Sequence, residues 1–200
     1  MTRVPVLPTI FVVLCVAVMI ALGWWQLRVR LPQKEAQLAQ LAANPARPPI
    51  AFPLTPDQSL LFRRTSLDCA KVESIDRNGA GGAGFRLIAN CRTRAAGPPV
   101  KVQLGTTRDP MKTVTWAGGV VSGWISHAPD ATPLGTRLFS QPPRELLLVA
   151  DRPVAGLSPN TRPDIGLVPN NHLAYAGQWF FFAAVAAVIY ALALRRRWRG

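Results

Sequence analysis

The sequence is poor in the residues that build catalytic and metal sites. Its 200 residues include only two histidines, three cysteines and ten acidic residues. No two cysteines form a Cys-x-x-Cys pair, and three are too few for a disulfide-dense small protein. The chain also has no Gly-x-Ser-x-Gly, His-Glu-x-x-His, phosphate-binding loop or Cys-x-x-Cys-His haem-attachment sequence. These absences lead us to expect a protein that is not an enzyme.

Negative charge is scarce, and the net charge of +13 raises the question of a nucleic-acid partner. The position of the charge argues against one. Four basic residues lie between 195 and 199, Arg3 lies near the other end, and residues 28–172 carry 18 basic against 10 acidic side chains. The two end clusters adjoin apolar runs, a pattern typical of membrane flanks. We therefore expect membrane lipid, and no nucleic acid, as a partner.

Two long uncharged runs dominate the sequence, Val4–Leu22 and Leu173–Leu194. Each has about the 20 residues that a helix needs to cross the hydrocarbon core, and each has aromatic residues at its border. The first run could instead be a cleaved signal peptide, but a Trp-Trp-Gln-Leu-Arg sequence stands where a small-x-small cleavage site belongs. The second could be a buried core helix, which its length and the arginines after it disfavour.

The basic tail predicts the orientation of both helices. Arg195–Arg199 should face the cytoplasm, and two crossings then place both termini there and residues 28–172 outside. Taken alone, the first helix weakly favours the opposite orientation. That helix begins by residue 4, which leaves no room for a mitochondrial presequence, so we expect a bacterial inner membrane. Alanines at i, i+4 spacing predict that the helices pack together, through Ala17 and Ala21 on one and Ala183, Ala187 and Ala191 on the other.

Between the helices, the pattern changes from helical to strand-like. We expect transmembrane helix 1 over 4–27, a helix and proline-rich linker over 28–57, an extracytoplasmic β domain over 58–168, transmembrane helix 2 over 172–194, and a basic cytoplasmic tail over 195–200. Short apolar runs separated by turns predict an antiparallel sheet, with strands at Leu61–Asp68, Phe85–Cys91, Val100–Leu104, Val114–Trp124 and Glu145–Asp151. The predicted fold class is an α+β membrane protein, with two transmembrane helices enclosing an extracytoplasmic antiparallel β-sheet domain.

Cys69 and Cys91 flank a glycine-rich turn. A hairpin centred on residue 80 would place the two cysteines opposite each other and would pair Ile75 with Phe85. Opposed cysteines in an oxidising compartment can form a disulfide, and one that links residues 22 apart stabilises a fold by roughly 3 kcal/mol. We expect a structural disulfide; a redox or copper-binding pair is the alternative.

The segment from Pro169 to Trp179 carries the most informative side chains. With the C-terminus inside, His172 stands at the outer mouth of the second helix, and Tyr175 and Trp179 share its helical face. Gln178 lies within the apolar zone, where polar groups usually face another helix or a ligand. His172 could equally be an interfacial residue that caps the helix start. The other histidine, His127, is expected in a solvated loop.

Both ends of the chain resemble the Surfeit locus protein 1 family, whose members are assembly factors of cytochrome c oxidase. The first match is Leu22-Gly23-Trp24-Trp25-Gln26-Leu27, followed by Arg30 and Lys34, although these last two are shifted by one residue from the family spacing. The second is Asn171-His172-Leu173-Ala174-Tyr175-Ala176 with Gln178-Trp179-Phe180, and it is the more specific. The family's central Arg-Gly-Trp segment is at best reduced to Leu104-Gly105-Thr106.

This resemblance implies a chaperone-like inner-membrane factor that handles haem a on its way to the catalytic subunit. It implies cytochrome c oxidase subunit I and haem a synthase as partners, and His172 as the axial ligand. The chemistry of the residues is compatible, because haem iron takes imidazole and the aromatic rings of Trp25, Tyr175 and Trp179 could line an apolar groove. Our own inference is that Arg28 and Arg30 pair with the propionates.

Two alternatives stay open. The chain could be a scaffold that stabilises oxidase assembly intermediates without touching haem. It could also be an extracytoplasmic thiol oxidoreductase that uses Cys69 and Cys91, although the missing Cys-x-x-Cys counts against that function.

Overall fold

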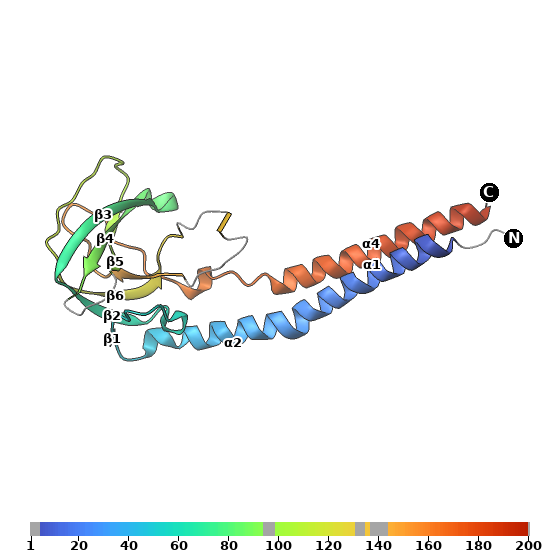
Figure 1. Ribbon diagram of the computed structural model, residues 1–200, viewed down its shortest axis with the longest axis horizontal. Coiled ribbons are helices and arrows are strands. Elements are labelled where there is room, and N and C mark those ends of the chain that lie inside the picture. Colours follow the sequence, from blue (N-terminus) through green and yellow to red (C-terminus); the bar gives the residue numbers. More distant parts are fainter. Residues whose placement is uncertain (1–4, 94–98, 131–134, 137–143, 200) are drawn as a thin grey trace. The chain divides into compact units, whose positions relative to one another are not determined.

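The computed structural model describes residues 5–93, 99–130, 135–136 and 144–199. The chain forms two compact units. The first consists of residues 1–38 and 168–200, and the second of residues 39–167. The first unit is a pair of long helices and the second is a β-sheet domain (Figure 1).

The helical unit contains the two long apolar segments of the sequence. Helix α1 covers Val6–Trp25 and passes into a five-residue π-helical segment, Gln26–Arg30, and then into α2, Leu31–Ala42. Helix α4 covers His172–Arg199 and includes the arginines at its end. Both apolar helices are long enough and apolar enough to cross a membrane. Only 6% of the most apolar stretch of each is buried, which does not fit the core helix of a soluble protein.

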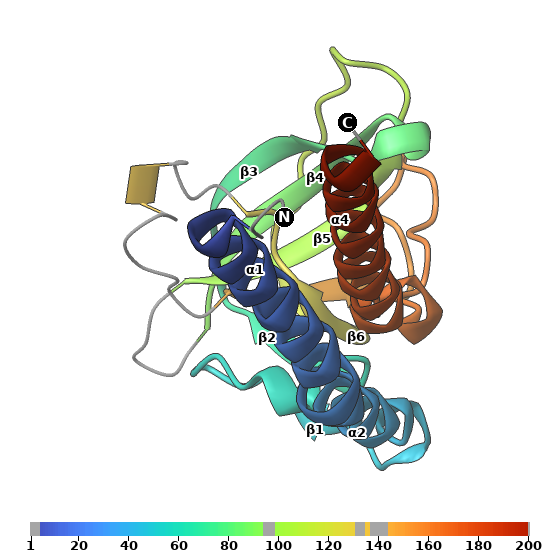
Figure 2. The same cartoon turned by 90° about the vertical axis from the view of Figure 1, so that its right-hand side faces the viewer.

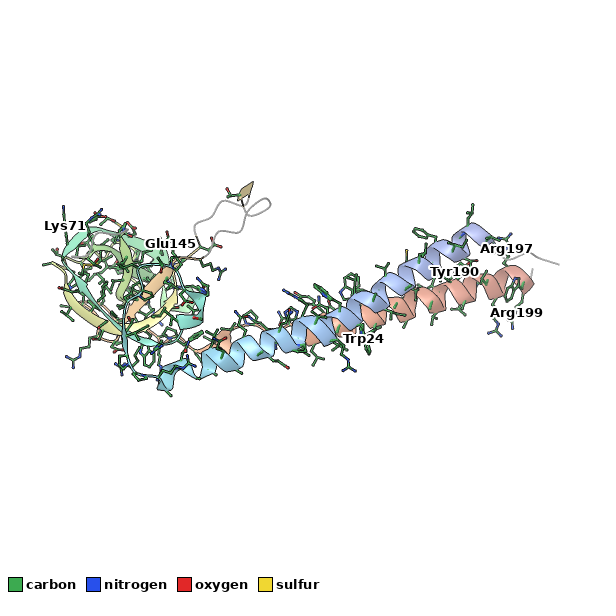
Figure 3. The ribbon with its side chains drawn as sticks, turned by 60° about the horizontal axis from the view of Figure 1, so that its bottom comes forward. Trp24, Lys71, Glu145, Tyr190, Arg197 and Arg199 are labelled. Atoms are coloured by element: carbon green, nitrogen blue, oxygen red, sulfur yellow. A yellow bond between two sulfur atoms is a disulfide. The ribbon has the colours of Figure 1, made fainter. Side chains whose placement is uncertain are left out.

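Helices α1 and α4 lie side by side and antiparallel, with the two chain ends at the same end of the pair (Figures 1 and 2). Near that end the hydroxyls of Thr9 and Tyr190 are 2.5 Å apart and form a hydrogen bond. Figure 3 shows Arg197 and Arg199 beyond Tyr190, on the last turns of α4. A polar contact of this kind is one way in which apolar helices fix their register.

The helices pack through small residues, and of the alanines that the sequence suggested only Ala183 is among them. Gly23, Ala176 and Ala183 are buried at the contact, and a Cβ atom on Gly23 would lie 2.9 Å from the Phe180 ring. The other four expected alanines are exposed: Ala17, Ala21, Ala187 and Ala191. The prediction of packing through small residues was right at Ala183 and wrong at the other four positions, because alanine recurs on several faces of both helices.

The sheet domain contains a seven-stranded sheet in the order β1-β2-β6-β7-β5-β4-β3 (Figure 1). Its strands are β1 Ile50–Ala51, β2 Arg64–Cys69, β3 Lys71–Gly79, β4 Phe85–Arg92, β5 Val100–Thr107, β6 Gly119–His127 and β7 Leu146–Ala150. The expectation of an antiparallel sheet was wrong in part, because β1 pairs with β2 and β5 pairs with β7 in parallel. A parallel pair requires a long crossover, and residues 108–145, which contain β6, connect β5 to β7.

β1 was not predicted, and β3 was expected only as one arm of the hairpin centred on residue 80. β1 has only two residues, too few for a periodic pattern. β3 is an exposed strand with charged residues along it, which hides its apolar alternation. Residues 114–118 were expected to begin a strand, but they lie outside β6, which starts at Gly119. The other expected strands overlap the observed ones, with ends that differ by a few residues.

The chain turns a corner between β2 and β3 at Ala70, which makes the sheet curl. These two strands follow each other directly in sequence but lie near opposite ends of the strand order. The amide of Ala70 donates to the carbonyl oxygen of Arg92 in β4. Gly118 approaches the corner closely: a Cβ atom on it would lie 2.4 Å from the carbonyl oxygen of Cys69, and its φ is +98°. Only glycine fits there.

A disulfide joins Cys69 of β2 to Cys91 of β4, with Cα atoms 5.4 Å apart. The hairpin register that suggested this pair was wrong. Val72 lies opposite Cys91, and Ile75 lies opposite Ala89 rather than Phe85. The reason is that the turn is a 3-10 turn at Gly81–Ala83, with a bulge between Val72 and Ser74. Cys69 reaches Cys91 around the corner at Ala70.

The core lies at the centre of the sheet. All five residues of β7 are buried, since this strand runs between β5 and β6. The largest fully buried apolar side chains are Ile88, Val102, Leu104, Ile125, Leu147 and Leu148. Asn44 is also fully buried and donates to the carbonyl oxygens of Ser59 and Leu61. This bond pair ties the segment after α2 to the loop before β2.

Candidate functional site

The candidate site lies at the end of the helical unit where α4 begins. His172, Tyr175, Gln178 and Trp179 occupy the first two turns of α4. Trp25 is the last residue of α1, and Arg28 and Arg30 belong to the π-helical segment after it. All seven residues singled out in the sequence thus come from the same helix pair, within about two turns of the place where α1 ends and α4 begins.

His172 forms the one side-chain hydrogen bond that joins the two helices at this end, within the described residues. Its Nδ1 atom lies 2.8 Å from Oε1 of Gln26, 146 residues away in the sequence. The His172 side chain is partly buried, and its Nε2 atom makes no hydrogen bond to any residue that the structure describes. The imidazole is therefore held on one side and open on the other.

Two tryptophan–arginine pairs border the site. The guanidinium of Arg28 lies 4.8 Å from the Trp24 ring centroid, and that of Arg30 lies 5.5 Å from the Trp25 ring centroid. Both distances are within the range of cation–π attraction. The pairs place positive charge beside indole rings that are about half exposed, at 56% for Trp24 and 44% for Trp25 (Trp24 is labelled in Figure 3). Such a border suits the headgroup level of a bilayer.

The side chains in the first turns of α4 differ in their exposure. Trp179 is partly buried, whereas Tyr175 is 47% exposed. Gln178 is also exposed, so its amide does not face α1. The residue of α4 that is most fully buried at this end is Ala176, at 1% exposure. The structure therefore brings His172 to α1 and leaves Tyr175 and Gln178 on outward faces, where they are accessible to lipid or to a ligand.

Gln26 is the site residue that the sequence reasoning missed. It belongs to the segment that carries the family resemblance, but it had no chemical role assigned to it. The signal that could have found it is the level of each polar side chain along the helix axes. Where one apolar helix ends and an antiparallel one begins at the same membrane surface, the polar side chains that border the two apolar runs lie at the same level. Gln26 is the first polar side chain after the apolar run of α1, and His172 is the last before that of α4.

The sheet domain has two polar features of its own. His127 is partly buried, and its Nε2 atom makes a hydrogen bond with Oε1 of Gln58. Burial lowers the pKa of His127 below its ordinary value, and the positive charge of Arg144 lowers that pKa further. This residue is at the end of β6 rather than in the solvated loop that the sequence suggested.

The second feature is an open cleft of about 630 Å³. Its lining includes Arg64, Trp116, Val121, Asp151, Arg152 and Val154. Arg64 pairs with Asp151 at 2.6 Å, and its guanidinium lies 5.1 Å from the Trp124 ring centroid, on which Arg162 also stacks at 3.8 Å. Across the described residues, no cluster of three or more His, Cys, Asp or Glu side chains could hold a metal ion.

A model of one protein family matches residues 13–184, which is most of the chain. The chain belongs to the SURF1 family. The match includes both segments that meet at the Gln26–His172 contact, together with the whole sheet domain. No curated protein and no solved structure matches the chain.

The SURF1 family is a family of cytochrome c oxidase assembly factors, so membership associates this chain with oxidase assembly. The family likeness and the two membrane-capable helices around a sheet domain agree with an inner-membrane protein. The Gln26–His172 hydrogen bond joins the two segments in which the family resemblance was recognised, one from each helix.

Proposed function

We propose that this chain is an inner-membrane assembly factor that holds haem a through His172 and assists its delivery to the catalytic subunit of cytochrome c oxidase. Subunit I and haem a synthase are the proposed partners. The observation that carries the proposal is the state of His172. Its imidazole is fixed at Nδ1 by Gln26 and open at Nε2, at the border of an apolar helix pair.

The side chains around His172 fit a haem. A porphyrin supplies four nitrogen ligands, so a single histidine from the protein completes a site that needs no further metal-binding cluster. The exposed rings of Trp25 and Tyr175 and the partly buried ring of Trp179 offer apolar surface for the macrocycle and its tail. Arg28 and Arg30 offer guanidinium groups for the propionates. Bound haem a would supply the iron centre that the oxidase requires, and these residues would bind and orient it.

The test is to replace His172 with Ala in the full-length protein, co-expressed with haem a synthesis. The variant should insert normally, because the position is at the helix end, and it should lose or shift the haem spectrum of the purified protein. The oxidase made in its presence should contain less haem a. The matched control is His127→Ala, which should change neither. A normal haem spectrum at normal stoichiometry in His172→Ala would show that the ligand is wrongly assigned.

The cleft in the sheet domain favours a second candidate, a scaffold that grips oxidase subunits without touching haem. Arg152 and Trp116 are exposed to it and could contact a client protein. Under this function, Arg152→Glu or Trp116→Ala should reduce co-purification of oxidase subunits, and the wild-type protein should contain no haem. A haem spectrum that depends on His172 would decide in favour of the first proposal.

The burial of the disulfide disfavours a thiol oxidoreductase. Cys69 is 2% exposed and Cys91 is 0% exposed. Exchange requires a thiolate to reach one of the sulfur atoms, and neither is accessible in this fold. Replacing both cysteines with serine should therefore lower stability and should leave thiol–disulfide exchange with a reporter protein unchanged.

A further inference from the structure

The hydrogen bond between Gln26 and His172 determines more than the packing of two helices. Oε1 of Gln26 faces Nδ1 of His172 at 2.8 Å, and because a carbonyl oxygen can only accept, this contact is a hydrogen bond when Nδ1 carries the proton. In a neutral imidazole, protonation at Nδ1 leaves the lone pair on Nε2. An acceptor on α1 thus favours the tautomer in which Nε2 of His172 can bind a metal.

The backbone around Gln26 is arranged so that its side chain reaches α4. Three residues earlier, Gly23 has no side chain, and the Phe180 ring occupies the space next to it. Ala176, one turn beyond His172, is buried in the same seam. Small residues on both helices let the backbones approach closely at this end, which brings an amide side chain within hydrogen-bond reach of an imidazole.

A local change of helix type begins at the same residue. The α-helix gives way to a π-helical segment at Gln26–Arg30, and the amide of Gln26 donates to the carbonyl oxygens of both Leu22 and Gly23. π-helical insertions are rare and are frequently found at functional sites, because they redirect the side chains of one turn. Here the insertion separates the direction of Gln26, toward α4, from that of Arg28 and Arg30, which stack on tryptophans.

We propose that Gln26 is a positioning residue, which holds His172 in the Nδ1–H tautomer and presents Nε2 for coordination of the haem iron. The role rests on the proposed function of His172. Metal-binding histidines generally donate the N–H of their second ring nitrogen to a neighbouring group, and this hydrogen bond fixes the ring orientation and the tautomer.

The first experiment measures the tautomer without any haem. The chain has only two histidines, so ¹⁵N-histidine labelling of the full-length protein in detergent gives two pairs of ring-nitrogen signals, and His127→Gln assigns them. Wild-type His172 should be protonated at Nδ1. Gln26→Leu, which removes the acceptor at similar size, should shift the population toward Nε2–H, whereas Gln26→Glu should keep the proton on Nδ1.

The second experiment adds haem a to the same proteins. Gln26→Leu should bind it about 10- to 100-fold more weakly, the usual cost of losing an outer partner. Gln26→Glu should retain binding with a lower reduction potential, because a carboxylate makes the imidazole a stronger donor. The matched control is Gln33→Leu, the same substitution at an exposed position of α2 in the same helical unit. It should change neither readout.

The outcomes separate this proposal from the one on which it rests. If wild-type His172 is protonated at Nε2, or if Gln26→Leu leaves its tautomer or its haem affinity unchanged, Gln26 is not a positioning residue. If the tautomer responds as expected but the wild-type protein binds no haem a, the proposed function fails while the hydrogen bond stands, and the assignment of Gln26 to haem coordination falls with it.

Discussion

At the scale of single residues, His127 makes the stability of the sheet domain depend on pH. Its pKa is lowered by burial first and by Arg144 second, so the unfolded chain, with an ordinary pKa near 6.5, takes up a proton before the folded one does. The contribution of neutral His127 to the free energy of unfolding is therefore fully present above about pH 6.5. It is lost as the pH falls through the lowered pKa of the folded state.

The measurement is the urea midpoint of the full-length protein in detergent at pH 7.5 and pH 5.5. The wild-type midpoint should be lower at pH 5.5, and His127→Gln should reduce the difference because glutamine keeps a polar side chain but does not titrate. Equal pH dependence in the two proteins would mean that other groups account for it.

The contrast between His172 and Gln26 shows what sequence could predict of the site. His172 was recognisable because a histidine at the mouth of an apolar helix is chemically conspicuous. Gln26 was not, because its significance depends on the register of two helices 146 residues apart in the chain. That register is determined by contacts such as Gly23 against Phe180, which no periodicity of either helix reveals alone.

At the scale of elements, the seam between α1 and α4 depends on Gly23. We expect Gly23→Leu to separate the helices at this end, because even a Cβ atom would lie 2.9 Å from the Phe180 ring. The matched control is Gly177→Leu, since a Cβ atom at Gly177 meets nothing within 4 Å. The readout is crosslinking by a short bis-maleimide between cysteines placed at positions 26 and 172, in a Cys15→Ser background. Gly23→Leu should lower the yield several-fold and Gly177→Leu should not.

The strands illustrate the reach of sequence patterns at this scale. β7 was expected because five consecutive apolar residues end at an aspartate, and it is buried throughout. Its parallel pairing with β5 could not be predicted, since a local pattern records burial and not the direction of a neighbour that is more than 40 residues away. The register of β3 against β4 was missed because a 3-10 turn and a bulge each shift the pairing.

The Cys69–Cys91 disulfide should stabilise the sheet domain by about 3 kcal/mol, the value expected from the chain-entropy cost of a 22-residue separation. Replacing both cysteines with alanine should lower the free energy of unfolding in urea by that amount, while Cys15→Ser should have little effect. In intact cells, thiol reagents without reductant should modify neither residue. Equal stability of the double variant would show that the bond does not form in the native protein.

At the scale of the whole molecule, the charge distribution predicts the topology. Arg195, Arg196, Arg197 and Arg199 end α4, and positive flanks remain on the cytoplasmic side. A reporter fused after residue 200 should be active only in the cytoplasm, and one inserted at an exposed position of the sheet domain should be active only outside. A periplasmic C-terminus would reverse the placement of His172 and of every proposal that depends on it.

The sheet domain is an insertion of 129 residues, Ala39–Leu167, between the two parts of the helical unit. The sheet domain therefore links the two long helices, and the effective concentration of one helix near the other depends on whether this link is folded. A chain of this length has a radius of gyration of about 14 Å when folded and about 37 Å when unfolded, and the effective concentration of tethered groups falls steeply as their link lengthens. Unfolding the sheet domain would thus weaken the pairing of α1 with α4, and with it the bond between Gln26 and His172. Substitutions deep in the sheet should for this reason weaken the proposed binding of haem a at His172 without touching any residue near it.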